Sequence, residues 1–265
     1  MRSDTNRRQL SVSDVPCQFL PWDSDFFGRR IARANFSRLT QKLIEDVYAW
    51  CEEHSIECLY LLADADDPDT IRLAEDHTFR LVEVRVTMER WLKDWNPTSR
   101  PKASAAVRVR PATEADIPVM RLTARNSYVD SRFYFDTCFP ESLCQEYYAT
   151  WIENSVKGYA DMVLVAEAGG KYFGYITGKL EKEHLHAQFV LIGVEENARR
   201  FGVGQELFRC GLDWFVNHGA EYVWVATQGR NLPAQRLIYR DGFLTRQVQL
   251  YYHKWFSSCP SSFNP

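Results

Sequence analysis

The stretch Asn231-Leu-Pro-Ala-Gln-Arg-Leu-Ile-Tyr239-Arg-Asp-Gly242-Phe243 decides the fold, because it carries the start, the body and the end of one short helix. Asn231 is a good N-cap, Pro233 falls in the first turn, and Gly242 stands where a helix C-terminus favours glycine. Tyr239 lies on a flank of this helix, away from the apolar stripe of Ala234, Leu237 and Ile238. This position favours a functional tyrosine, with a half-exposed tyrosine that caps a sheet as the alternative.

A glycine-bearing loop, Arg199-Arg-Phe-Gly202-Val-Gly204, lies one helix and one strand upstream. It follows a mostly apolar run of strand length, Gln188–Val194, and precedes Gln205–His218, which has the apolar period of a packed helix. Backbone N–H groups at such a junction are unpaired, and glycines let phosphate oxygens approach closely. The loop therefore predicts a pyrophosphate site, with a plain glycine turn as the alternative. It is not the dinucleotide motif G-x-G-x-x-G, because no third glycine follows at the required spacing.

An internal similarity links residues 56–91 to residues 220–255 without a gap. Both segments have the pattern of a strand, a helix and two further strands, which predicts a duplication; two unrelated α/β segments are the alternative. The identical pairs are Glu57/Glu221, Arg72/Arg236, Leu73/Leu237, Phe79/Phe243, Val84/Val248 and Trp91/Trp255. The first copy has Glu75 in place of Tyr239 and Thr78 in place of Gly242, and no Gly-x-Gly loop precedes it. We therefore expect it to have the fold without the chemistry.

Composition excludes several classes of protein. The chain has 265 residues, a net charge of −3 and 45% hydrophobic residues, which is typical of a soluble protein and argues against nucleic acid as a partner. We expect a cytoplasmic location and no membrane association, because no apolar run is long enough to span a membrane and the first residues have no signal-peptide pattern. The cysteines are never spaced as C-x-x-C, so no metal site is expected.

Residues 107–256 resemble the GNAT superfamily of acyl-CoA-dependent N-acyltransferases. The resemblance rests on Val107-Arg-Val-Arg-Pro-Ala-Thr-Glu-Ala-Asp116, on Val194 followed by Arg199-x-x-Gly202-x-Gly204, and on Asn231, Ala234, Tyr239 and Gly242-Phe243. It implies an α+β fold, in which helices flank a mixed, mostly antiparallel sheet, and acetyl-CoA as the co-substrate.

The resemblance also implies roles for individual residues. The transfer would be a direct attack of a primary amine on the thioester, with Tyr239 as the general acid for the leaving thiolate. Backbone amides of the strand would hold the pantetheine and the thioester, those of the loop would hold the pyrophosphate, and Asn231 would face the thiol end. The residues expected to bind the cofactor are Ile192, Gly193, Val194, Arg199, Arg200, Phe201, Gly202, Val203, Gly204 and Asn231.

Four domain segments are expected. Residues 1–95 would form an N-terminal α/β domain, the degenerate copy described above. Residues 96–105, which are rich in proline and small polar residues, would form a linker. Residues 106–256 would form the acetyltransferase domain, and residues 257–265 a flexible tail.

The acceptor amine is harder to predict. Two segments, Trp22–Gly28 and Ser131–Pro140, resemble pieces of nucleotide-sugar amine acetyltransferases, so a dTDP-amino sugar is the expected substrate. Arg132 could pair with a diphosphate, Phe133 and Tyr134 could stack on a base or a sugar, and Asp136 could accept protons from hydroxyl or ammonium groups. The alternative is that these aromatic residues pack one helix onto the next.

The general base is poorly determined by the sequence. A water chain that ends at His186 is our choice, and Glu167, Glu181, Glu183 and His184 stay open. Two other functions also stay open: N-acetylation of an antibiotic or peptide amine, and a module that binds acyl-CoA without catalysis. Nothing in the residues decides the oligomeric state, and a homodimer stays open.

Overall fold

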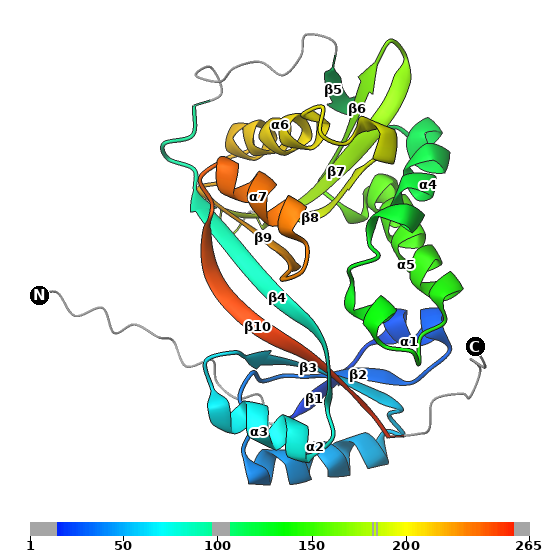
Figure 1. The fold of residues 1–265 in the computed structure, drawn as a ribbon, viewed down its shortest axis with the longest axis vertical. Coiled ribbons are helices and arrows are strands. Elements are labelled where there is room, and N and C mark those ends of the chain that lie inside the picture. The colour runs from blue at the N-terminus through cyan, green and yellow to red at the C-terminus, as the bar shows by residue number, and fades with distance from the viewer. Residues whose placement is uncertain (1–14, 97–106, 182, 184, 257–265) are drawn as a thin grey trace, which may run out of the picture. The chain divides into compact units, whose positions relative to one another are not determined.

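The structure is a computed structural model that describes residues 15–96, 107–181, 183 and 185–256 (Figure 1). The chain forms two compact units, one of residues 1–82 with 249–265 and one of residues 83–248. Two long strands, β4 (Arg80–Trp91) and β10 (Leu244–Trp255), each begin in one unit and end in the other. The units therefore do not divide the chain at the expected linker, most of which lies outside the described residues.

The unit of residues 1–82 with 249–265 has a four-stranded sheet in the order β1-β2-β3-β10. Its strands β2 and β3 are parallel, and the other two pairings are antiparallel. Its elements before β4 are β1 (Cys17–Phe19), α1 (Pro21–Phe27), β2 (Ile31–Ala34), α2 (Gln41–Glu53), β3 (Cys58–Asp64) and α3 (Pro68–Asp76). An apolar core that includes Ile44, Val47, Leu59 and Leu61 joins the helices to the sheet.

The unit of residues 83–248 has the sheet order β4-β9-β8-β7-β6-β5, in which only β8 and β9 are parallel. Its strands after β4 are β5 (Arg108–Pro111), β6 (Met162–Ala168), β7 (Lys171–Glu181), β8 (His186–Val194) and β9 (Tyr222–Gln228). Its longer helices are α4 (Ile117–Ser127), α5 (Glu141–Asn154), α6 (Val203–Asn217) and α7 (Leu232–Arg240), with short 3-10 turns at Glu114–Asp116, η3 (Arg132–Phe135) and Glu196–Ala198 and a π turn at Ser155–Tyr159. The expected mixed, mostly antiparallel sheet with flanking helices is confirmed.

Helices cover both faces of this second sheet. Gly211 of α6 and Phe189 of β8 are in such close contact that a Cβ on the glycine would stand 2.5 Å from the ring. Gly174 and Gly178 of β7 also face α6, where they meet Leu207 and Phe215. Because side chains alternate along a strand, Tyr175 of β7 points to the other face, where its hydroxyl lies 3.0 Å from that of Tyr128 at the end of α4.

The internal similarity is also a repeat of structure. Strand β3, helix α3 and strand β4 begin and end at the residues that a constant offset of 164 maps onto β9, α7 and β10. The two strands that we expected at the end of each copy form one long strand. The C-terminal half of each long strand pairs with a strand of the other copy. That half of β10 runs antiparallel to β3, and that half of β4 runs antiparallel to β9, in the same register.

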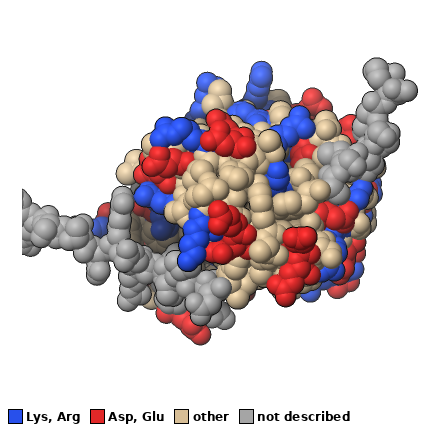
Figure 2. All heavy atoms as spheres, turned by 90° about the horizontal axis from the view of Figure 1, so that it is seen from below, with Lys and Arg blue, Asp and Glu red and all other residues tan. Residues whose placement is uncertain are grey.

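Charge is spread over the surface. Figure 2 shows lysine and arginine interspersed with aspartate and glutamate on one face, with no continuous basic area. In the part of the chain that the structure describes, no helix is long and apolar enough to cross a membrane.

Candidate active site

The parallel strands β8 and β9 separate along their length. They pair from His186 beside Tyr222 to Phe189 beside Val225, and the pairing of the described residues goes no further. The remaining residues of β8, as far as Val194, therefore border a gap that opens toward the carboxyl ends of both strands. Such an opening exposes strand edges that a ligand can pair with.

A bulge in β8 lies where the two strands separate. Ile192 pairs with Ile176 of β7, but Phe189 pairs with Gly178, so β8 has one residue more than β7 over this interval. The N–H of Leu191 donates to the hydroxyl of Thr177 at 3.0 Å, and the N–H of Glu195 donates to the carbonyl of Phe173. Because successive N–H groups of a strand point to opposite edges, those of Ile192 and Val194 point away from β7, toward the gap.

The predicted pyrophosphate loop has the backbone of an anion site. Arg200 and Gly202 both have positive φ, +69° and +82°, and Gly202 is the N-cap of α6 without any side-chain cap. The first hydrogen bond of the helix is from Glu206 N–H to the Gly202 carbonyl, so the amides of residues 203–205 have no partner within it. Such a turn directs several N–H groups and the helix dipole at one point.

The equivalent helix of the first unit has a side-chain cap at its N-terminus, unlike α6. In α2, which follows the parallel strand β2, the N-cap is Thr40, and its hydroxyl accepts the N–H of Leu43. The N–H of Leu39 donates to Thr70. The Thr40 hydroxyl thus uses one of the first-turn amides that an anion would need, whereas Gly202 of the second unit has no side chain for such a cap.

Close packing joins the loop, the strand and α7. A Cβ on Gly204 would stand 3.0 Å from Leu237 Cδ1 and 3.5 Å from Val194 Cγ2. Gly204 thus lets α6 pack closely on α7 and on the open end of β8, where a side chain would displace Leu237. Two of the predicted cofactor residues, Val194 and Gly204, meet at this point.

Asn231 caps α7 as the sequence predicts. Its side-chain oxygen accepts the N–H of Ala234 at 3.1 Å, and Pro233 follows in the first turn. The side-chain oxygen of Asn231 is thus used in capping the helix. The backbone around Asn231 lies at the carboxyl end of β9.

Tyr239 is not brought to the loop. The Leu237 flank of α7 faces Gly204, and residues two apart on a helix project about 200° from one another. The phenol of Tyr239 accordingly projects from the opposite flank, is 46% exposed and lies 2.5 Å from the hydroxyl of Thr245. Its role as general acid remains a prediction, and this placement does not support it.

His186 is likewise far from the bulge. It is the first residue of β8 and lies at the closed end of the gap, where its ring is 4.9 Å from that of Tyr222. Six residues of strand separate it from Ile192, which is about 20 Å. The structure therefore does not join His186 to the predicted thioester site. Of the other candidate bases, Glu167 forms an ion pair with Arg110, and His184 lies outside the described residues.

The predicted acceptor-binding residues mostly face the interior. Phe133 is fully buried and packs against Phe139 and Tyr147, and Asp136 is buried and accepts the N–H of Cys138. Phe133 and Asp136 therefore lie where they would if this segment packed against its neighbours and did not bind the acceptor. Arg132 lies with its guanidinium 4.2 Å from the ring of Phe133, and burial raises the pKa of Tyr134 to about 12.

Glu83, a carboxylate that we did not predict, is buried beside these residues. It lies on β4, is 5% exposed, accepts the N–H of Arg132 at 2.9 Å and bonds to the side chain of Gln228, the last residue of β9. Burial raises its pKa, and the charges of Arg132 and Arg85 oppose that effect only in part. A carboxylate of this kind at the end of a gap is suited to proton transfer.

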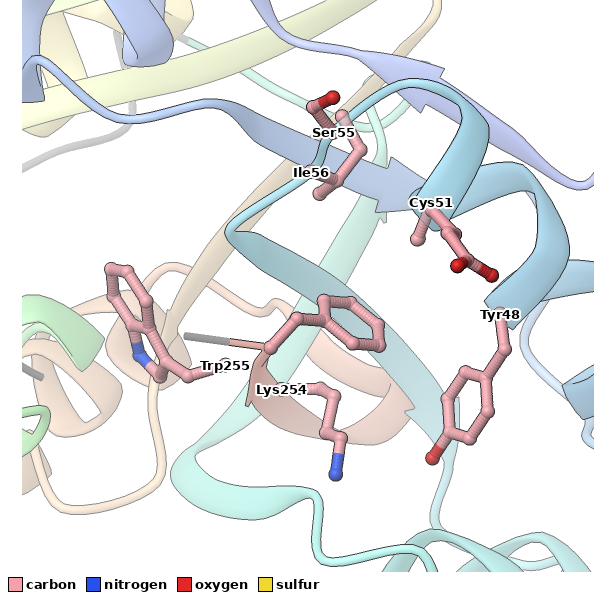
Figure 3. A pocket seen from close by; sticks show the side chains of 8 residues that line it. Tyr48, Cys51, Ser55, Ile56, Lys254 and Trp255 are labelled. Carbon is pink, nitrogen blue, oxygen red and sulfur yellow. The ribbon is translucent and has the colours of Figure 1, made fainter. Parts of the chain in front are cut away.

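A separate pocket lies in the first unit. It has a volume of about 450 Å³ and lies at α2 and the end of β10, with the rings of Tyr48 and Trp255 on different sides (Figure 3). Lys254 also lines it, and burial lowers the pKa of its ammonium group. None of the predicted site residues is among those that line this pocket. The described residues contain no group of three or more His, Cys, Asp or Glu side chains that could hold a metal ion.

Curated proteins with similar sequences are acetyltransferases or act in polysaccharide synthesis. The chain is 27% identical to a dTDP-fucosamine acetyltransferase of Escherichia coli over 226 residues, which cover 84% of this chain and 91% of that protein. It is 25% identical to the spore coat polysaccharide biosynthesis protein SpsD of Bacillus subtilis, over 55% of this chain and half of that protein.

Solved structures agree in fold. A GCN5-related N-acetyltransferase from Sphaerobacter thermophilus matches 91% of this chain and 76% of its own, with a TM-score of 0.66 and 15% identity. A tandem GNAT protein from the clavulanic acid pathway matches 87% of this chain and 77% of its own, with a TM-score of 0.62 and 16% identity. The acetyltransferase (GNAT) family model matches residues 130–243, which include the bulged strand, the loop and α7. Residues 130–243 therefore form an acetyltransferase domain of the GNAT family.

Proposed function

We propose that this protein transfers an acetyl group from acetyl-CoA to the primary amine of a nucleotide-linked amino sugar. The observation that supports this most is the uncapped N-terminus of α6, which packs through Gly204 against the open end of β8. The pyrophosphate would accept hydrogen bonds from the amides of residues 203–205, and the pantetheine would extend along the edge of β8 that faces the gap.

The chemistry is a direct attack without a covalent enzyme intermediate. The amine nitrogen bonds to the acyl carbon and the carbon–sulfur bond breaks, so the enzyme mainly holds both reactants in place. Donors at the gap edge of β8 would stabilise the oxyanion, each by about 2.7–4 kcal/mol in comparable sites. Glu83 would receive the amine proton, directly or through a water molecule, and it replaces His186 in this role because it lies at the open end of β9. Tyr239, which the sequence predicts as the donor to the thiolate, has no part in this proposal, because its phenol projects away from the loop flank of α7.

The acceptor class rests on similarity and on Arg132. The E. coli relative is named for a dTDP-linked amino sugar, and the B. subtilis relative for polysaccharide synthesis. Arg132 is the predicted partner of a diphosphate, and its backbone N–H is bonded to Glu83, which would bring the acceptor near the proposed base.

An acceptor screen tests the proposal. The full chain is incubated with acetyl-CoA and with dTDP- and UDP-amino sugars, aminoglycosides and peptides, and the products are measured by mass spectrometry. We expect acetylation of a nucleotide amino sugar. The Glu83→Gln variant is the control, and it should form the same product more slowly. Acetylation only of an antibiotic or peptide would reject the acceptor class and keep the acetyltransferase.

A module that binds acyl-CoA without catalysis is the competing function. It predicts that the protein binds acetyl-CoA but releases no CoA with any amine in the panel. Buried Glu83 beside the end of the gap speaks against it, because a purely binding site has no use for a carboxylate with a raised pKa.

A further inference from the structure

Tyr128 lies at the point where the gap begins. It follows the last residue of α4, and the backbone N–H of Ile192, the first after the bulge that points to the gap, lies near enough to its hydroxyl to lower the pKa of the phenol against the larger effect of burial. The same hydroxyl is 3.0 Å from that of Tyr175. A phenol thus occupies the strand edge along which the thioester would lie.

Gly193 allows this arrangement. A Cβ on Gly193 would stand 2.8 Å from ring atoms of Tyr175, which is closer than real side chains approach. The absence of a side chain lets Tyr175 lie flat against β8 and reach Tyr128. The bulge, the glycine and both phenols therefore form one local structure.

Counting hydrogen-bond donors shows that this pair is incomplete. The two phenols have two O–H donors, and one of these is used in the bond between them. In the described part of the chain, the other O–H has no protein acceptor, although Tyr175 is fully buried and Tyr128 is half-buried. Buried donors are normally satisfied, so an acceptor atom of a ligand is expected here.

Two roles are open to a phenol beside a thioester: a proton donor to sulfur, or a hydrogen-bond donor to the acyl oxygen. Burial raises the pKa of Tyr128 above its usual value of about 10, whereas a thiol has a pKa of about 8.5. Proton transfer from this phenol to a thiolate would therefore be uphill. Donation of a hydrogen bond without transfer has no such cost, and the Ile192 N–H strengthens it by polarising the phenol oxygen.

We propose that the Tyr128 hydroxyl is a catalytic group that donates a hydrogen bond to the acyl oxygen of the bound thioester and to the oxyanion formed from it. The proposal rests on the proposed function, and it changes one part of it: the Ile192 amide acts through Tyr128 instead of meeting the acyl oxygen itself. No proton is transferred in this step. The amine proton still goes to Glu83, and the electron pair of the broken bond leaves with sulfur.

The test compares Tyr128→Phe with Tyr172→Phe. Tyr172 is another phenol of β7, its hydroxyl is buried without a hydrogen-bond partner among the described residues, and it has no role in the proposed site. We expect Tyr128→Phe to lower kcat by about 10- to 100-fold. This decrease is smaller than the one usually seen when an oxyanion donor is removed, because amides of the strand remain. The KM for acetyl-CoA and its dissociation constant should stay within about threefold, and Tyr172→Phe should change neither.

A spectroscopic measurement separates a catalytic from a structural role. Infrared difference spectra of carbonyl-¹³C acetyl-CoA bound to the protein report hydrogen bonding at the acyl oxygen. We expect a lowered carbonyl frequency in the wild type and in Tyr172→Phe, and a rise toward the unbonded value in Tyr128→Phe. Equal frequencies and equal kcat in wild type and Tyr128→Phe would overturn the proposal, whereas failure of the wild type to bind acetyl-CoA would overturn the proposed function instead.

Should Tyr128→Phe not fold, Tyr175→Phe takes its place in the infrared measurement. That variant keeps the Tyr128 donor, so the lowered carbonyl frequency must persist. An unbonded frequency in Tyr175→Phe would equally reject Tyr128 as the donor.

Discussion

At the scale of single residues, local signals were predictable and the buried partners were not. The caps at Asn231 and Gly202 follow from residue type and position within a few residues. Glu83 sits in an ordinary strand sequence, and it becomes a buried group only because Arg132 and Gln228, distant in sequence, fold against it. Tyr128 likewise acquires its position from the bulge in β8.

Replacement of Tyr239 by phenylalanine tests the general acid predicted from the sequence. Because its hydroxyl is half-exposed and projects away from the loop flank of α7, we expect kcat to stay within about threefold of wild type. Steady-state kinetics with the acceptor identified in the screen provide the measurement. A loss of about 10²- to 10⁴-fold, the effect of a positioned acid, would restore Tyr239 to the mechanism.

Replacement of Glu83 by glutamine tests the base. A base acts when deprotonated, and burial raises the pKa of Glu83, so wild-type kcat/KM should rise with pH through a value above the ordinary 4.5. In Glu83→Gln we expect a loss of about 10²- to 10⁴-fold and no such rise. Glu89→Gln is the control, since Glu89 lies on the same strand and bonds to Tyr222. An unchanged pH profile in Glu83→Gln would reject this base.

At the scale of elements, the sequence predicted the strand, loop and helix that build the proposed cofactor site, because each has its own start and stop residues. It did not predict the bulge, which depends on the register of β8 against β7 and on the Thr177 hydroxyl. The start of α4 is another element that local residues define. Asp116 accepts bonds from Thr113 and from the guanidinium of Arg110.

The Asp116 cluster gives a stability prediction with a definite sign. Bonds from Arg110, with smaller contributions from Thr113, lower the pKa of Asp116 to about 2 against the burial of the carboxyl. Its stabilisation is therefore present above the unfolded value of about 4 and is lost as the pH falls through about 2. We expect Asp116→Asn to lower the free energy of unfolding by about 1–2 kcal/mol at pH 7. Denaturant titrations should show this difference shrinking toward pH 2, and a constant difference would contradict the assignment.

At the scale of the whole molecule, the chain repeats one strand–helix–strand segment, and only the second copy has the loop. The sequence predicted the repeat but could not predict the exchange of the long strands, since pairing between distant strands leaves no local pattern. At the position of Gly242, φ +76°, the first copy has Thr78 with φ +57°. A β-branched residue is strained in this region.

Thr78→Asn should therefore stabilise the protein. Asparagine tolerates positive φ and keeps a side-chain oxygen, which can still accept a bond from the Lys254 ammonium as Thr78 does. We expect the free energy of unfolding to rise by about 1 kcal/mol, as measured from the denaturant midpoint. A lower midpoint would show that the threonine contacts outweigh the strain.

The central claim is that the loop at Gly202 holds the pyrophosphate of an acyl-CoA, and calorimetric titration with acetyl-CoA tests it most directly. Asparagine and aspartate both tolerate the positive φ of Gly202, so Gly202→Asn and Gly202→Asp differ only in charge. We predict that wild type binds acetyl-CoA with a dissociation constant between about 1 μM and 1 mM. Gly202→Asp should bind at least about tenfold more weakly than Gly202→Asn, since a charge beside the phosphates costs 1 kcal/mol or more, roughly. No uptake by wild type, or equal affinity in the two variants, would contradict the account.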